Sequence, residues 1–218
     1  MTLQCAILWD LDGVIVDSGD LHHRSWEMIL GEYGLEFPYN IFQKSFGSNN
    51  DTVLEMVLGR KPDNGWKKVV SFRKEEWFCQ HIHGGLKLLP GAIEWLQWFE
   101  DKGIPQAIAS SAPMENITLS LEEFHLSNFF QAIISGNRIV GKPDPKVFLR
   151  AAAALETPAE KCIVIEDTVH GMQGAFAGGM CCIAVATTFP ISEFTSATIS
   201  LNRLTDLTES QILDLINS

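Results

Sequence analysis

The sequence predicts an α/β fold, in which a doubly wound, Rossmann-like parallel sheet carries an inserted α-helical domain. Along most of the chain, short apolar runs of strand length alternate with segments of helical period. This alternation is typical of a parallel sheet that is covered by helices on both faces. Residues 18–84 break the pattern, because they read as helices without strands between them. We therefore expect a core of residues 1–17 and 85–218 and a helical insert of residues 18–84.

The elements of the core are predicted from the placement of apolar residues along the chain. Bulky apolar runs predict strands at 4–9, 106–110, 132–135, 162–166, 181–186 and, more weakly, 197–201. Helical period or strong helix formers predict helices at 91–101, 145–155 and 168–178. Right-handed crossovers would fix the chirality of each connection between neighbouring parallel strands.

The insert is expected to contain three helices, at 20–33, 51–59 and 64–82. Turn residues separate them, in FPYN at 37–40 and in GRKPDNG at 59–65. We expect Asp17 and Ser18 to cap the first helix. Gly84 and Gly85 are expected to form the hinge where the chain returns to the core. His81 and His83 resemble a metal-binding pair but fit the end of the last helix better.

Composition limits the classes of partner that this chain can have. Its formal charge of −11 argues against a broad nucleic-acid surface, which needs clustered Lys and Arg. No apolar run reaches the roughly 18 residues that a membrane span requires. The five cysteines include no C-x-x-C pair, which favours reduced, buried thiols. We expect a cytoplasmic protein that is a monomer, with neither nucleic-acid nor membrane partners.

Polar side chains follow the predicted strands at the points where these strands end. They are Asp10 and Asp12, Ser110 and Ser111, Lys142 in a later loop, and Glu166 with Asp167. Because the carboxyl ends of parallel strands meet at one edge of a sheet, these side chains should converge. Four carboxylates in one crevice need a cation, and oxygen ligands suit Mg²⁺. With a lysine and hydroxyls nearby, this arrangement favours phosphoryl transfer through an aspartate.

Four ordered motifs resemble those of the haloacid dehalogenase superfamily, in its phosphatase and β-phosphoglucomutase-like branch. They are DLDGVIVDS at 10–18, IASSA at 108–112, GKPDP at 141–145 and VIEDTVHGMQGAFAGGM at 164–180. Each motif alone is weak, but four in this order are specific. The resemblance implies that the helical insert is a small cap domain, which selects the leaving group while the core does the chemistry.

The resemblance also implies a role for each core residue. Asp10 would be the nucleophile, and Asp12 the acid and base that protonates the leaving oxygen and then activates water. Ser110, with Ser111 beside it, would hold the transferring phosphoryl group. Lys142 would balance the negative charge.

The resemblance implies Mg²⁺ as the cofactor. The carboxylates of Asp10, Glu166 and Asp167 and the backbone carbonyl of Asp12 would bind it. The partner of the site would then be a small phosphorylated metabolite. The metal would neutralise charge during formation and breakdown of an aspartyl-phosphate.

Two segments of the cap bear on the substrate. In DSGDLHHRSW, His22 matches a histidine near the active site of the β-phosphoglucomutase-like branch, although a helix-surface histidine explains it equally well. In SFGSNNDTV, Gly47 would allow a cap loop to approach the core closely. The mutase pattern has an arginine in this loop, whereas this chain has Ser48, Asn49 and Asn50.

The missing loop arginine favours hydrolysis of a phosphomonoester over mutase activity. Arg73 and Lys74 still offer positive charge from the last cap helix, so a β-phosphoglucomutase remains an alternative. A metal-free haloacid dehalogenase is a second alternative, but it gives no reason for Asp12 or for the Glu166–Asp167 pair. A non-catalytic phospho-receiver is a third, and it needs no cap.

Overall fold

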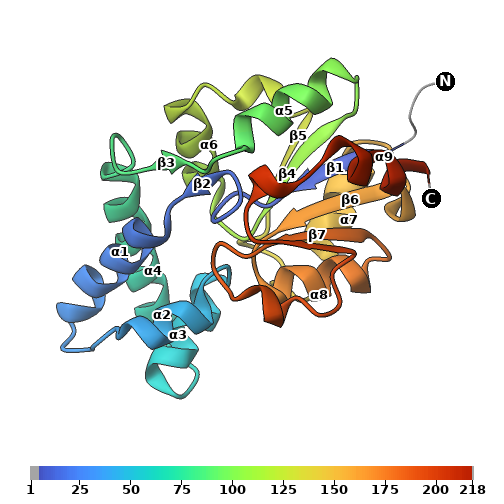
Figure 1. Cartoon of the computed structure of the whole chain (residues 1–218). Coiled ribbons are helices and arrows are strands. Elements are labelled where there is room, and N and C mark those ends of the chain that lie inside the picture. The colour runs from blue at the N-terminus through green and yellow to red at the C-terminus, as the bar shows by residue number, and fades with distance from the viewer. Residues whose placement is uncertain (1–4, 218) are drawn as a thin grey trace.

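The computed structural model describes residues 5–217, and its larger part is built on a six-stranded parallel sheet (Figure 1). The strands are β1 (Ala6–Trp9), β4 (Gln106–Ser110), β5 (Ala132–Ser135), β6 (Cys162–Glu166), β7 (Cys181–Val185) and β8 (Ile199–Leu201). They lie in the order β5-β4-β1-β6-β7-β8, and every neighbouring pair is parallel. The predicted doubly wound fold is therefore confirmed. The order reverses beside β1, which is where ligands bind in such sheets.

The two faces of the sheet are covered by different helices because the strand residues alternate between them. Ile7 and Trp9 of β1 pack with α5 (Ala92–Asp101), α6 (Met114–Glu123) and α9 (Glu209–Asn217). Ala6 and Leu8 face α7 (Lys146–Ala154) and α8 (Val169–Ala177) on the other side. Buried alanines from strands and helices are common on this second face, so its helices can approach the sheet closely.

The cap consists of α1 (Gly19–Gly31), α2 (Tyr39–Ser45), α3 (Asn50–Leu58) and α4 (Asn64–Gln80), which lie beside the sheet in Figure 1. It has an apolar cluster of its own, which includes Trp26, Leu30 and Leu54. The two crossings to the core pair as short antiparallel strands, β2 (Val16–Asp17) and β3 (Lys87–Leu88). We propose that the domain boundaries lie near these crossings, at 17/18 and 84/85.

Two local predictions for the cap are wrong. The FPYN segment is not a turn, because Pro38 stands at the N-cap of α2 and Tyr39 and Asn40 are already helical. Proline suits the beginning of a helix as well as it suits a turn, since its fixed φ is helical and it has no N–H to leave unpaired. Ser18 stands at the N-cap of α1, but neither it nor Asp17 caps the helix: the N-cap makes no side-chain hydrogen bond, and Asp17 belongs to β2.

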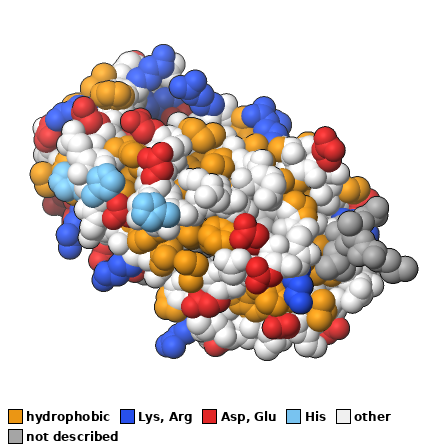
Figure 2. Space-filling model, turned by 90° about the horizontal axis from the view of Figure 1, so that it is seen from above, with side chains coloured by type: hydrophobic (Ala, Val, Ile, Leu, Met, Phe, Trp, Pro, Cys, Tyr) orange, Lys and Arg blue, Asp and Glu red, His pale blue; other side chains and the backbone are white. Residues whose placement is uncertain are grey.

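The surface carries both signs of charge. On the face shown in Figure 2, acidic side chains lie across the middle and basic ones lie mainly nearer the edges. Within residues 5–217, no helix is long and apolar enough to cross a membrane.

Candidate active site

Three buried carboxylates meet where β1 and β6 end. Asp10 follows β1, Glu166 is the last residue of β6, and Asp167 comes next. The two strands are neighbours, with Trp9 paired to Ile165, so the residues that follow must lie together. Each of these three residues offers an oxygen within 4.8 Å of the others, and none is more than 4% exposed.

Lys142 supplies a positive charge to this cluster. Its Nζ donates to Asp10 Oδ1 and, at 2.6 Å, to Glu166 Oε1. Burial alone would lower the pKa of Lys142, but the two carboxylates outweigh burial and raise it above its usual value. Lys142 therefore keeps its charge although its side chain is only 2% exposed. Lys142 therefore lies beside the acids, as the sequence predicted.

One positive charge does not neutralise the three carboxylates. Burial raises the pKa of Asp10 to about 7, with Lys142 opposing this and Glu166 adding to it. Burial, followed by the charges of Glu166 and Asp10, also raises the pKa of Asp167 well above its usual value. Asp167 Oδ1 is buried and has no hydrogen-bond partner among the described residues, while Oδ2 accepts from Thr188. An oxygen-only set with excess negative charge and an unpartnered oxygen fits a hard divalent cation such as Mg²⁺.

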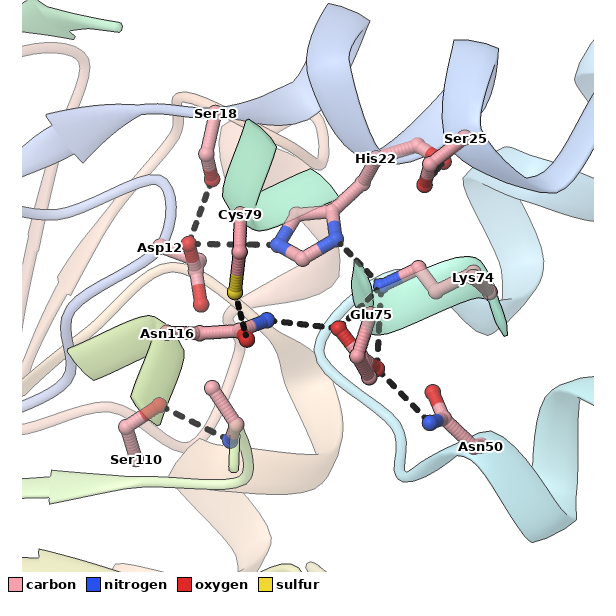
Figure 3. A network of polar contacts seen from close by, with 11 residues as sticks. Asp12, Ser18, His22, Ser25, Asn50, Lys74, Glu75, Cys79, Ser110 and Asn116 are labelled. Carbon is pink, nitrogen blue, oxygen red and sulfur yellow. Dashed lines mark hydrogen bonds and ion pairs between the residues drawn. The ribbon is translucent and has the colours of Figure 1, made fainter. Parts of the chain in front are cut away.

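The Asp12 carboxylate contacts Ser18 and His22 at the entrance of the cap (Figure 3). Its Oδ1 accepts from the Ser18 hydroxyl at 2.5 Å and lies 3.4 Å from His22 Nε2. Burial would raise the pKa of Asp12, but His22 and Ser18 together lower it below its usual value. The Ser18 hydroxyl, which we expected to cap a helix, donates to Asp12 instead.

A chain of polar contacts continues from Asp12 into the cap (Figure 3). His22 Nδ1 lies 2.9 Å from Lys74 Nζ, and Lys74 Nζ donates to both carboxylate oxygens of Glu75 at 3.1 Å. A lysine ammonium has only donors, so His22 Nδ1 must accept. Neutral His22 then carries its proton on Nε2, which faces Asp12. The His22 ring also stacks on Phe78, with 4.1 Å between the ring centroids.

The predicted substrate-binding residues line one pocket between core and cap. The lining includes Asp10, Asp12, His22, Gly47, Ser48, Asn49, Asn50, Lys74, Ser110 and Ser111. Gly47 has a φ of 77°, and a Cβ there would lie 2.6 Å from Thr168 Cγ2, so the cap loop does approach the core closely. Arg73 points elsewhere, because its guanidinium pairs with Glu32. The two histidines at the end of α4 are also apart: His81 stacks on Trp77 and His83 pairs with Glu123.

Sequence reasoning missed several residues that position the site. Thr168 fixes Glu166, since its backbone N–H and hydroxyl both donate to Glu166 Oε2, at 2.6 and 2.8 Å. Its place as the N-cap of α8, two residues after Glu166, was a usable signal. Thr188, Glu75 and Asn116 carried no such signal, because their contacts join segments far apart in the sequence.

Gly171 is needed because α8 begins directly against Glu166. A Cβ at Gly171 would overlap the Glu166 carboxylate, so Gly171→Ala should displace Glu166 or the helix. We expect a loss of about 1–3 kcal/mol in the free energy of unfolding, as for other overpacked sites. Urea denaturation measures it. Gly178→Ala is the matched control, since a Cβ there makes only ordinary contacts, the nearest at 3.4 Å. Equal stability of the two variants would contradict this account.

Comparison with known proteins identifies the family. The model of the haloacid dehalogenase-like hydrolases matches residues 7–185. The chain is 31% identical to 5-amino-6-(5-phospho-D-ribitylamino)uracil phosphatase of Arabidopsis thaliana, over 95% of this chain but only 56% of that protein. It is 28% identical to hexitol phosphatase B of Escherichia coli K12, over 95% of this chain and 96% of that protein.

The fold has a counterpart among solved structures. The β-phosphoglucomutase of Clostridium difficile superposes with a TM-score of 0.87, covering 97% of this chain and 96% of that one at 22% identity. At this identity the likeness establishes the fold alone. The match of the family model over most of the chain establishes more: this protein belongs to the haloacid dehalogenase-like hydrolase family.

Proposed function

We propose that this protein is a Mg²⁺-dependent phosphatase that hydrolyses a small phosphomonoester, such as a sugar phosphate, through an aspartyl-phosphate on Asp10. The observation that carries the proposal is the acidic cluster of Asp10, Glu166 and Asp167, neutralised only in part by Lys142. Asp10 also lines the pocket shared with Asp12 and Ser110. The names of two relatives, a hexitol phosphatase and a phosphoribitylaminouracil phosphatase, support the substrate class.

Asp10 is the proposed nucleophile. One of its oxygens forms a bond to phosphorus while the bond from phosphorus to the leaving oxygen breaks, which splits one difficult displacement into two easier ones. Lys142 donates to Asp10 and Glu166, so it holds the nucleophile in place and opposes the negative charge of the site. Mg²⁺ would be held by Asp10 and Asp167, with Glu166 and the Asp12 carbonyl beside it, and would offset charge on the phosphoryl oxygens.

Asp12 is the proposed general acid and base. In its protonated form Asp12 would give a proton to the leaving oxygen, and the carboxylate so formed would later take one from the water that hydrolyses the aspartyl-phosphate, a contribution of about 10²–10⁴-fold. Ser18 and His22 donate to Asp12 from the cap side, so they orient its carboxylate within the pocket. The Ser110 hydroxyl accepts from the Ala112 N–H, which leaves its own proton free for a phosphoryl oxygen.

The proposal predicts strict metal dependence. We expect the purified protein to hydrolyse an aryl phosphate in millimolar Mg²⁺, to lose this activity in excess chelator, and to regain it when Mg²⁺ is restored. The reason is that buried Asp10, Glu166 and Asp167 carry more negative charge than Lys142 offsets. Release of phosphate measures the rate. Phosphate release that survives the chelator would contradict the proposed role of Mg²⁺.

The mutase alternative is tested on the same preparation. Formation of glucose 6-phosphate from β-glucose 1-phosphate, primed with the bisphosphate, would establish a mutase. Multiple turnovers of phosphate release, with no such conversion, support the phosphatase. They also exclude a receiver that only stores phosphate.

A further inference from the structure

The end of the pocket away from Asp12 and Ser110 is formed by two consecutive residues of α4, Lys74 and Glu75 (Figure 3). Among the described residues that line the pocket, Lys74 is the single lysine or arginine. Three carboxylate side chains line it too, those of Asp10, Asp12 and Glu75. Whether this end can hold an anion depends on whether the Lys74 charge is free.

The Lys74 ammonium is already committed to protein groups. It lies 2.9 Å from His22 Nδ1 and 3.1 Å from both oxygens of Glu75, and the side chain is 2% exposed. An ammonium has three donors, and these contacts engage at least two of them, because one N–H can serve both oxygens of a single carboxylate. The ring centroids of Trp26 and Phe78 lie 5.5 and 5.0 Å from Lys74 Nζ. Glu75 therefore already balances the Lys74 charge, so little of that charge is left to attract a substrate anion.

Glu75 is held as a fixed carboxylate by amides from two other helices. Its Oε1 accepts from Asn50 of α3 at 2.7 Å, and its Oε2 accepts from Asn116 of α6 at 2.6 Å. Burial would raise the pKa of Glu75, but Lys74, followed by His22 and the two amides, outweighs burial and lowers it. The carboxylate is therefore charged at neutral pH, and its position is set from both the cap and the core.

We propose that Glu75 restricts this site to monophosphates with a neutral, hydroxyl-bearing leaving group, and that it rejects substrates with a second anionic group. The inference rests on the proposed phosphatase function. A second phosphate or a carboxylate at this end would meet the Glu75 charge with Lys74 already neutralised, and like charges at close range are costly in a partly buried site. A neutral polyol has no such cost, and the side chains of Ser48 and Asn49 offer it polar partners.

The wild-type protein tests the proposal with a matched pair of substrates. Glucitol 6-phosphate and 6-phosphogluconate differ at one carbon, where a CH₂OH group in the first is a carboxylate in the second. We expect kcat/KM to be at least about tenfold higher for glucitol 6-phosphate, which corresponds to about 1.4 kcal/mol. Equal kcat/KM values would overturn the proposal while leaving the phosphatase function intact. Absence of hydrolysis of any phosphomonoester, the aryl phosphate included, would overturn both.

Glu75→Gln assigns the discrimination to this residue. The change removes the negative charge and frees the Lys74 ammonium, so the ratio of the two kcat/KM values should shift about tenfold toward 6-phosphogluconate. Loss of cap stability alone would lower both values together and leave the ratio unchanged. Glu76→Gln is the matched control, because Glu76 is the exposed neighbour on α4 and lies outside this pocket. An unchanged ratio in Glu75→Gln, or an equal shift in Glu76→Gln, would show that the charge of Glu75 does not select the substrate.

Discussion

Replacing Asp10 by asparagine is expected to reduce kcat for phosphate release by on the order of 10⁴-fold or more, as the loss of a nucleophile does in other covalent enzymes. The amide has nearly the same shape as the carboxylate but does not attack phosphorus. Lys142 retains its contact with Glu166, so the pocket should keep its form. The measurement is steady-state hydrolysis of an aryl phosphate at saturating Mg²⁺, together with circular dichroism to establish that the variant is folded.

Asp17→Asn is the matched control for this experiment. Asp17 belongs to the same acidic segment of the sequence, but it is exposed on β2 and lies outside the pocket that Asp10 lines. We expect its activity to stay within about twofold of the wild type, as for surface changes that touch no special feature. If Asp10→Asn kept full activity, the proposed aspartyl-phosphate mechanism would be wrong.

The acidic cluster of Asp10, Glu166 and Asp167 could be predicted because it depends on short, local sequence patterns. Asp10 and Glu166 each end an apolar run, and parallel pairing alone brings the ends of such runs together. Lys142 lies in a loop rather than directly after a strand, so its convergence with the acids was a less direct prediction, and its role came from the family resemblance. Here the structure agrees, since Lys142 bonds to both Asp10 and Glu166.

The cap end of the site could be predicted only in part, because it depends on how helices pack. A histidine at position 22 and a lysine at 74 were candidates, but the contact between them needs α1 and α4 side by side. Glu75 draws its partners from α3 and α6, which no pattern in the sequence relates. Ser18 shows the same difficulty locally, since a serine before a helix favours capping until a half-buried carboxylate such as Asp12 competes for its hydroxyl.

Asp167→Asn should raise the stability of the metal-free protein and weaken the stabilisation that Mg²⁺ gives. In the metal-free protein the pKa of Asp167 is raised well above its usual value, by burial first and then by Glu166 and Asp10. A carboxyl with a raised folded-state pKa destabilises the fold at any pH above its unfolded pKa, because the unfolded chain ionises it more easily. At pH 7–8 the asparagine should therefore raise the melting temperature of the metal-free protein by about 2–8 °C, which corresponds to about 1–2 kcal/mol in a domain of this size.

Two further measurements separate this electrostatic cause from a change in packing. Near pH 4 and below, the wild-type carboxyl is protonated in the folded state and increasingly so in the unfolded state, so the advantage of asparagine should shrink toward zero. Addition of Mg²⁺ should stabilise the wild type, because a ligand that binds only the folded state raises its stability, and should stabilise Asp167→Asn far less. Thr188→Val is the control, since it removes the hydroxyl that donates to Asp167 and leaves the charge in place. Thr188→Val should lower the melting temperature of the metal-free protein. If Asp167→Asn and Thr188→Val instead shifted the melting temperature in the same direction, the assignment of excess buried charge to Asp167 would be wrong.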